Sequence, residues 1–87
     1  MIKTFRCAET QSLFSGARVR RFVNIETVAR RKLEMVAAAK KLEDLRIPPG
    51  NRLEALKGDR AGQCSIRVND QFRVCFRWND GAENVEI

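Results

Sequence analysis

Three arginines in the last third of the chain fall where the alternating side chains of a β-hairpin would share one face. Arg67 lies in one predicted strand, and Arg73 and Arg77 lie in the next. A three-residue loop at 69–71 would place Arg67 directly opposite Arg73. Like charges directly across a strand pair destabilise it. A fold that keeps this pair has either a compensating acid or an anionic ligand, and no acid alternates onto this face within either strand.

More charged residues precede this hairpin and are expected to rim the same surface. Lys57 and Arg60 lie in the turn that enters the hairpin, and Glu54 is close by in the sequence. These side chains with Arg73 would suit RNA cleavage by internal transesterification, in which a base takes the 2′-hydroxyl proton and cations stabilise charge on the phosphorane oxygens. The alternative, that arginines only solvate an exposed sheet face, is preferred for Arg77. The candidate catalytic residues are Arg73, Lys57 and Glu54, and the candidate RNA-binding residues are Arg67, Arg60 and Arg77.

The strands that must position these residues show a clear period of two. Residues 64–68 and 72–78 each alternate apolar and polar side chains, which predicts two antiparallel strands. The apolar set of both strands is expected to face the helices. Asn79-Asp80-Gly81 is typical of a hairpin turn, and a last strand is expected to begin near Val85.

The first half of the chain is predicted to be mainly helical. Residues 2–7 predict a short strand, and residues 9–14 predict one or two helical turns. Asn24 is expected to cap a helix from Ile25 to about Leu45, with a bend or a break near Ala37–Ala39. A strand, then helices, then an antiparallel meander predict an α+β domain with the helices on one face of the sheet.

Size, charge and cysteine content narrow the class of protein. The 87 residues form one domain over 1–87, because neither half could bury a core alone. Seventeen Lys and Arg against eleven Asp and Glu give a net charge of +6, which favours a polyanionic partner such as RNA, DNA or a membrane surface. The alternative is a solvated basic surface without such a partner. Without histidine or a C-x-x-C spacing we expect no metal or other cofactor. Cys7 and Cys64 are expected on apolar faces of strands. With no apolar stretch of spanning length, a cytoplasmic protein that does not enter the membrane is expected.

The segment from Arg52 to Phe76 closely resembles HigB toxins, also called plasmid maintenance killer proteins, of the RelE superfamily. The most specific block within it is Leu-Lys-Gly-Asp-Arg followed by Ser-Ile-Arg-Val and a further arginine. The opening Met-Ile-Lys-Thr-Phe and the connection Pro-Pro-Gly-Asn-Arg also match members of the family. The resemblance covers essentially the whole chain.

This resemblance implies a RelE-like fold and metal-independent cleavage of mRNA in the ribosomal A site, which inhibits translation. It also implies an antitoxin of the HigA type with a helix-turn-helix domain, so that operator DNA is bound only through the toxin–antitoxin complex. The family's phosphate-stabilising lysine matches Lys57, and its transition-state arginine matches Arg73. Some members have a catalytic histidine where this chain has Glu54; relatives in the superfamily use a glutamate as general base, and a surface residue without a role is the other interpretation.

Two other functions compete with a ribosome-dependent endoribonuclease. One is a non-catalytic basic module that occupies RNA or the ribosome without cutting, and the other is an inactive toxin that acts mainly by binding its antitoxin. HigB chains usually continue with an acidic-Tyr-His type tail that contributes to catalysis, whereas this sequence ends at Ile87. If the protein ends there, we expect slow cleavage, because none of the residues considered above has a suitable pKa for protonating the leaving 5′-oxygen.

Overall fold

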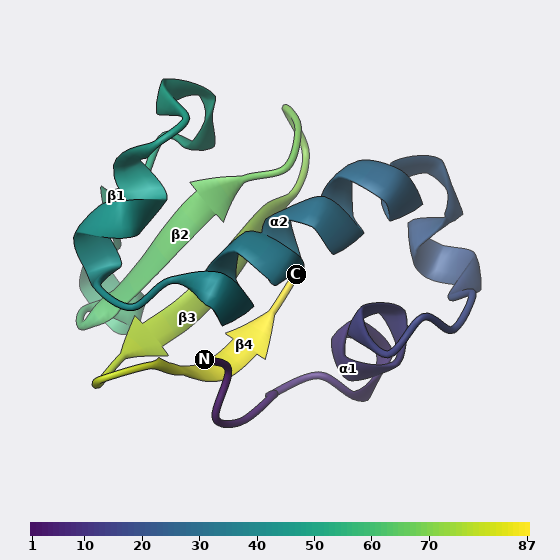
Figure 1. Cartoon of the computed structure of the whole chain (residues 1–87), viewed down its shortest axis with the longest axis horizontal. Helices are drawn as coiled ribbons and strands as arrows, with labels where there is room; N and C mark the ends of the chain where they lie inside the picture. Colours follow the sequence, from purple (N-terminus) through teal and green to yellow (C-terminus); the bar gives the residue numbers. More distant parts are fainter.

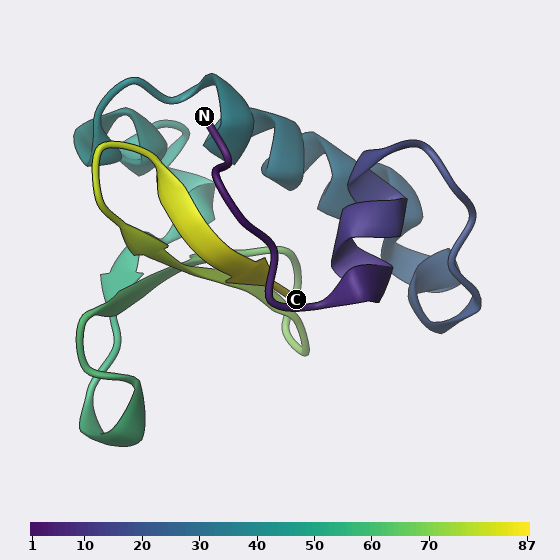
Figure 2. The same cartoon turned by 90° about the horizontal axis from the view of Figure 1, so that it is seen from below.

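The computed structural model describes residues 1–87 as a four-stranded antiparallel sheet with helices packed against one of its faces (Figure 1). The strands lie side by side in chain order and are β1 (Glu54–Ala55), β2 (Gln63–Arg67), β3 (Arg73–Trp78) and β4 (Ala82–Glu86). The two α-helices are α1 (Ala8–Phe14) and α2 (Glu26–Ala38). Helix α2 lies across the sheet, and the opposite sheet face carries no α-helix (Figure 2). The predicted α+β class and the antiparallel meander are therefore confirmed.

The core lies between α2 and the apolar face of the sheet. Apolar side chains that recur along α2 at helical spacing are buried, as are those that alternate along the strands. The buried apolar residues of these elements are Ala29, Leu33, Val36, Ile66, Val74, Phe76, Ala82 and Val85. The side chains that alternate with them on β2 and β3 must therefore point to the face without helices. No helix in the structure is both long and apolar enough to cross a membrane.

The long helical region is divided into three pieces. A 3₁₀ helix, η1 (Arg20–Ile25), runs directly into α2, and another, η2 (Leu42–Arg46), follows it. The break expected near residues 37–39 is confirmed, since Ala39 has an extended backbone. The prediction that Asn24 caps the helix is wrong: Asn24 is exposed within η1, and Ile25 holds the N-cap position without a side-chain hydrogen bond. Because η1 leads straight into α2, the helix has no free end at Asn24.

The amino-terminal segment lies beside β4 without forming a regular strand (Figure 2). It makes two isolated parallel bridges, between Ile2 and Ala82 and between Phe5 and Val85, so the predicted strand over 2–7 is wrong in this detail. Between the bridges the backbone of Asn84 has a φ of +54°, and its N–H donates to the Thr4 side chain at 2.8 Å. This irregularity in β4 interrupts a continuous ladder. Cys7 consequently precedes α1 and does not lie on a strand face.

A buried asparagine connects α2 to the segment that leads into the sheet. Asn51 is fully buried, and its amide donates to the Leu45 carbonyl at 3.2 Å while its carbonyl oxygen accepts a hydrogen bond from the Lys32 ammonium group. Burial lowers the pKa of Lys32, and the nearby Arg31 and Arg67 lower it further. Asn51 therefore connects the chain just before β1 to α2 through Lys32 and to η2 through Leu45.

Candidate functional site

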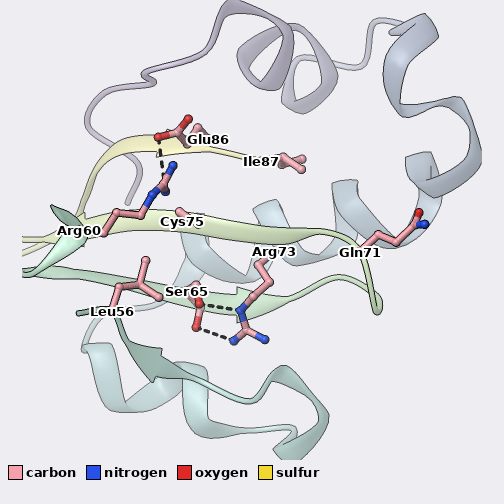
Figure 3. A pocket seen from close by; sticks show the side chains of 8 residues that line it. All are labelled: Leu56, Arg60, Ser65, Gln71, Arg73, Cys75, Glu86 and Ile87. Carbon is pink, nitrogen blue, oxygen red and sulfur yellow. Dashed lines mark hydrogen bonds and ion pairs between the residues drawn. The ribbon is translucent and has the colours of Figure 1, made fainter. Parts of the chain in front are cut away.

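A shallow cavity of about 290 Å³ opens on the sheet face that the helices leave free (Figure 3). It is lined by Leu56, Arg60, Ser65, Gln71, Arg73, Cys75, Glu86 and Ile87. These residues come from three strands, two turns and the positions directly after β1 and β4, and they meet because antiparallel neighbours place opposed side chains on the same face. The cavity thus gathers two guanidinium groups and one carboxyl group at one place.

The predicted pairing of two arginines across the hairpin is confirmed, but their guanidinium groups do not face each other. Arg67 and Arg73 are partners in the β2–β3 register. The Arg67 guanidinium forms an ion pair with Asp70 in the hairpin loop, whereas Arg73 turns toward Ser65. A loop acid and a set of neutral acceptors thus relieve the repulsion that the sequence implied. As a consequence Arg67 lies outside the cavity lining.

Arg73 is held in place almost entirely by neutral groups. Its Nε donates to the Ser65 Oγ at 2.7 Å, and its Nη2 donates to the carbonyl oxygens of Arg52 and Ser65 at 2.6 and 3.3 Å. The nearest carboxylate, Glu54, is exposed and lies 3.9 Å from Nη2, which is too far for a hydrogen bond. Nη1 has no partner in the protein. The guanidinium is therefore ordered and has donors left for an anion.

Reasoning from the sequence missed the carboxylate of the cavity, Glu86. Cys75 pairs with Glu86 and Arg77 pairs with Glu83, so a step of two positions along β3 is matched by a step of three positions along β4. The extra residue forms a bulge at the positive φ of Asn84, which places both glutamates on the arginine face. The sequence did contain a signal for this bulge. The two apolar residues of β4 that are buried, Ala82 and Val85, lie three positions apart, whereas a regular strand would space them by two.

The Glu86 carboxylate lies between two arginines from distant parts of the chain. Its Oε2 is 3.6 Å from the Arg6 Nε and 3.9 Å from the Arg60 Nη1, and this oxygen is buried and accepts no hydrogen bond. Cys75 lies beside this group. Burial raises the pKa of the Cys75 thiol, although the charge of Arg60 partly offsets the rise. At neutral pH Cys75 is therefore a neutral wall of the cavity.

Three of the residues expected to act on RNA lie apart from the cavity. Lys57 is exposed just before the 3₁₀ turn η4 (Gly58–Arg60), and its side chain makes no hydrogen bond or ion pair. Arg77 is exposed, and its guanidinium lies so close to Gly62 that a Cβ there would meet Nη1 at 3.2 Å. Arg67 is occupied by Asp70. The structure thus brings Arg73, Arg60 and, at the edge, Glu54 together. No group of three or more Cys, Asp or Glu side chains gathers as a possible metal site.

This geometry defines the class of protein: a small α+β domain with a cationic cavity on its open sheet face. A model of the family described as RelE-like toxin of type II toxin-antitoxin system HigB matches residues 7–86. The chain therefore belongs to the HigB-like toxin family.

Two curated proteins are similar to this chain. Toxin HigB-1 of Vibrio cholerae serotype O1 is 57% identical over 58 residues, which are 67% of this chain and 61% of that protein. An uncharacterized protein of Haemophilus influenzae is 39% identical over 61 residues, which are 70% of this chain and 60% of that protein. The chain thus spans about three fifths of the length of the curated relatives that it matches.

Proposed function

We propose that this protein acts as the toxin of a type II toxin–antitoxin system by cleaving mRNA on the ribosome without a metal ion, which stops translation. The observation that carries this proposal is the state of Arg73. It lines an open cavity, three neutral acceptors order its guanidinium, and its Nη1 has no partner. A fixed arginine on an open surface, whose nearest carboxylate lies 3.9 Å away, is suited to an anionic substrate, and the family match favours RNA as that anion.

In the proposed reaction the ribose 2′-oxygen attacks the adjacent phosphorus, the bond to the 5′-oxygen breaks, and the leaving 5′-oxygen takes a proton from water and departs as a hydroxyl. Arg73 stabilises the charge that develops on the non-bridging oxygens, and Lys57 assists it from the edge of the site. Glu54, whose carboxylate lies 3.9 Å from the Arg73 Nη2, takes the proton of the 2′-hydroxyl. Arg60, Arg67 and Arg77 contact the RNA backbone, which raises affinity without selecting a sequence.

The make-up of the cavity supports the proposed dependence on the ribosome. None of its eight lining residues is aromatic, so it offers no platform on which a base can stack. The aromatic rings of β3 belong to the core cluster or pack against it. The ribosome therefore has to hold the scissile phosphate in place, and such positioning is a large part of the reaction barrier.

The proposed partners are an antitoxin and the translating ribosome in the cytoplasm. A family of toxin–antitoxin toxins implies a cognate antitoxin, and we propose one of the HigA type with a helix-turn-helix domain. Operator DNA would then be bound only through the complex of the two proteins.

Mapping transcript 5′ ends after induction of the protein tests this function. Induction of the wild-type protein should create new ends inside translated codons, and Arg73→Ala should lower their formation roughly a hundred- to a thousandfold. Arg46→Ala, which removes an exposed arginine far from the cavity, is the matched control. Stalled translation with intact messages would instead support a non-catalytic binding module, and no effect on translation would support a protein that acts only through its antitoxin.

A further inference from the structure

The bulge in β4 gives Glu86 a position that no other acidic residue of the chain has. Glu86 is the one carboxylate among the residues that line the cavity. With regular alternation from Glu83, the side chain at position 86 would face the helices. The extra residue at Asn84 turns it to the cavity side, opposite Cys75. A bulge that re-aims one side chain into a cavity is a feature often found beside functional sites.

Glu86 is also the only acid that forms an ion pair with Arg60. Arg60 ends the turn η4, which projects from the sheet face, and half of its side chain is exposed (Figure 2). Apart from the neighbouring Cys75 thiol, nothing else in the chain restrains its guanidinium. The second cation on Glu86, Arg6, balances part of the negative charge that a carboxylate brings to this surface.

Arg60 and Arg73 reach the cavity from different sides. Arg60 lies on the side of Glu86 and Arg73 on the side of Ser65, with Cys75 between them (Figure 3). Arg73 donates hydrogen bonds to neutral acceptors, whereas Arg60 makes no hydrogen bond to a carboxylate and forms only an ion pair with Glu86 at 3.9 Å. Both guanidinium groups line the same cavity, so a phosphate group bound there would meet N–H donors from two sides.

We propose that Glu86 is a positioning residue, which holds Arg60 opposite Arg73 so that the cavity grips one backbone phosphate from two sides. This inference rests on the proposed function, because the phosphate in question belongs to the RNA. A carboxylate alone repels a phosphate, so its presence in the cavity is explained by its effect on Arg60. Glu86 touches no reacting atom and acts through the arginine.

A double-mutant cycle on ribosome-bound mRNA tests the role of Glu86. Glu86→Gln keeps the shape of the side chain and should lower kcat roughly ten- to a hundredfold while KM stays the same or falls, because Arg60 is misplaced but the cavity becomes more positive. In an Arg60→Ala background, Glu86→Gln should cause no further loss. Glu83→Gln is the control, since Glu83 lies on the same strand and face, pairs with Lys3 and is outside the cavity.

Two results of this cycle would overturn the inference. One is a Glu86→Gln protein with a lower KM and an unchanged kcat, which would show an effect of charge alone. The other is an equal loss from Glu86→Gln with and without Arg60, which would show that the two residues act independently.

A titration with inorganic phosphate separates this inference from the proposed function. In wild-type protein the Nε–H signals of Arg60 and Arg73, followed by NMR, should shift together, and the Arg60 shift should be lost in Glu86→Gln. This readout does not need mRNA cleavage, so a wild-type protein that fails to cut still decides the role of Glu86. A wild-type Arg60 signal that ignores phosphate while that of Arg73 shifts would contradict the inference.

Discussion

The Nε of Arg73 lies 2.7 Å from the Oγ of Ser65, and Ser65 is completely buried. The same guanidinium also binds the Ser65 carbonyl oxygen at 3.3 Å through Nη2. One serine thus contacts two of the three nitrogens of the arginine and sets the direction of the third, Nη1. These two contacts indicate that Ser65 positions Arg73 and does not only fill space.

Ser65→Ala is expected to reduce turnover without preventing folding. The variant loses one hydrogen bond to a charged group, worth about 1.5–3 kcal/mol, so kcat should fall roughly ten- to a hundredfold because Arg73 is less well ordered. Steady-state cleavage of ribosome-bound mRNA, together with thermal unfolding, measures both effects. Ser15→Ala is the control, because the Ser15 hydroxyl is exposed and binds only the Gln11 carbonyl at the end of α1. Unchanged kcat in a folded Ser65→Ala protein would remove the positioning role.

Glu54→Gln tests which carboxylate takes the 2′-hydroxyl proton. If Glu54 is the base, single-turnover cleavage should slow roughly a hundred- to ten-thousandfold, since the amide cannot accept a proton. Glu43→Gln, at an exposed position of η2 away from the cavity, should cleave at the wild-type rate. Full activity in the Glu54 variant would show that this exposed side chain only lies beside Arg73 and takes no part in proton transfer.

Asn51→Ala should destabilise the folded protein more than any exposed asparagine change. It leaves the Lys32 ammonium group and the buried Leu45 carbonyl without a partner, which costs about 1–3 kcal/mol. Urea unfolding followed by circular dichroism measures this change in the free energy of unfolding. Asn24→Ala should change that free energy by less than about 0.5 kcal/mol, because Asn24 is exposed and caps nothing. Equal effects of the two substitutions would contradict the role assigned to Asn51.

The three cysteines should react with alkylating reagents at different rates. Burial tends to raise the pKa of Cys7, but hydrogen bonds from the Thr10 side chain and from the backbone of Thr10 and Glu9 outweigh it and lower that pKa. Burial raises the pKa of both Cys64 and Cys75. Because the thiolate is the nucleophile, Cys7 should be modified first at neutral pH. Mass spectrometry of peptides after brief exposure to iodoacetamide measures the order, and earlier labelling of Cys75 would contradict it.

Local patterns in the sequence determined the elements that carry most of the candidate site. Alternation along residues 64–68 and 72–78 predicted the hairpin and its register, including the pairing of Arg67 with Arg73. This was possible because the period of two in a strand depends only on neighbours along the chain. The break after α2 could also be predicted from residues that are neighbours along the chain. The HigB resemblance, carried by a contiguous block of residues, identified the family that the comparison confirmed.

Only the tertiary structure decided which charged residues share the cavity. Arg73 is oriented by the carbonyl of Arg52, 21 positions earlier, and Glu86 pairs with Arg6, 80 positions away. Neither contact leaves a pattern in neighbouring residues. The bulge at Asn84 reversed the side to which Glu86 points, because one extra residue inverts the alternation of every residue after it. Which residues alternate is a local property of the chain, whereas the face that each side chain finally occupies depends on the strand against which it packs.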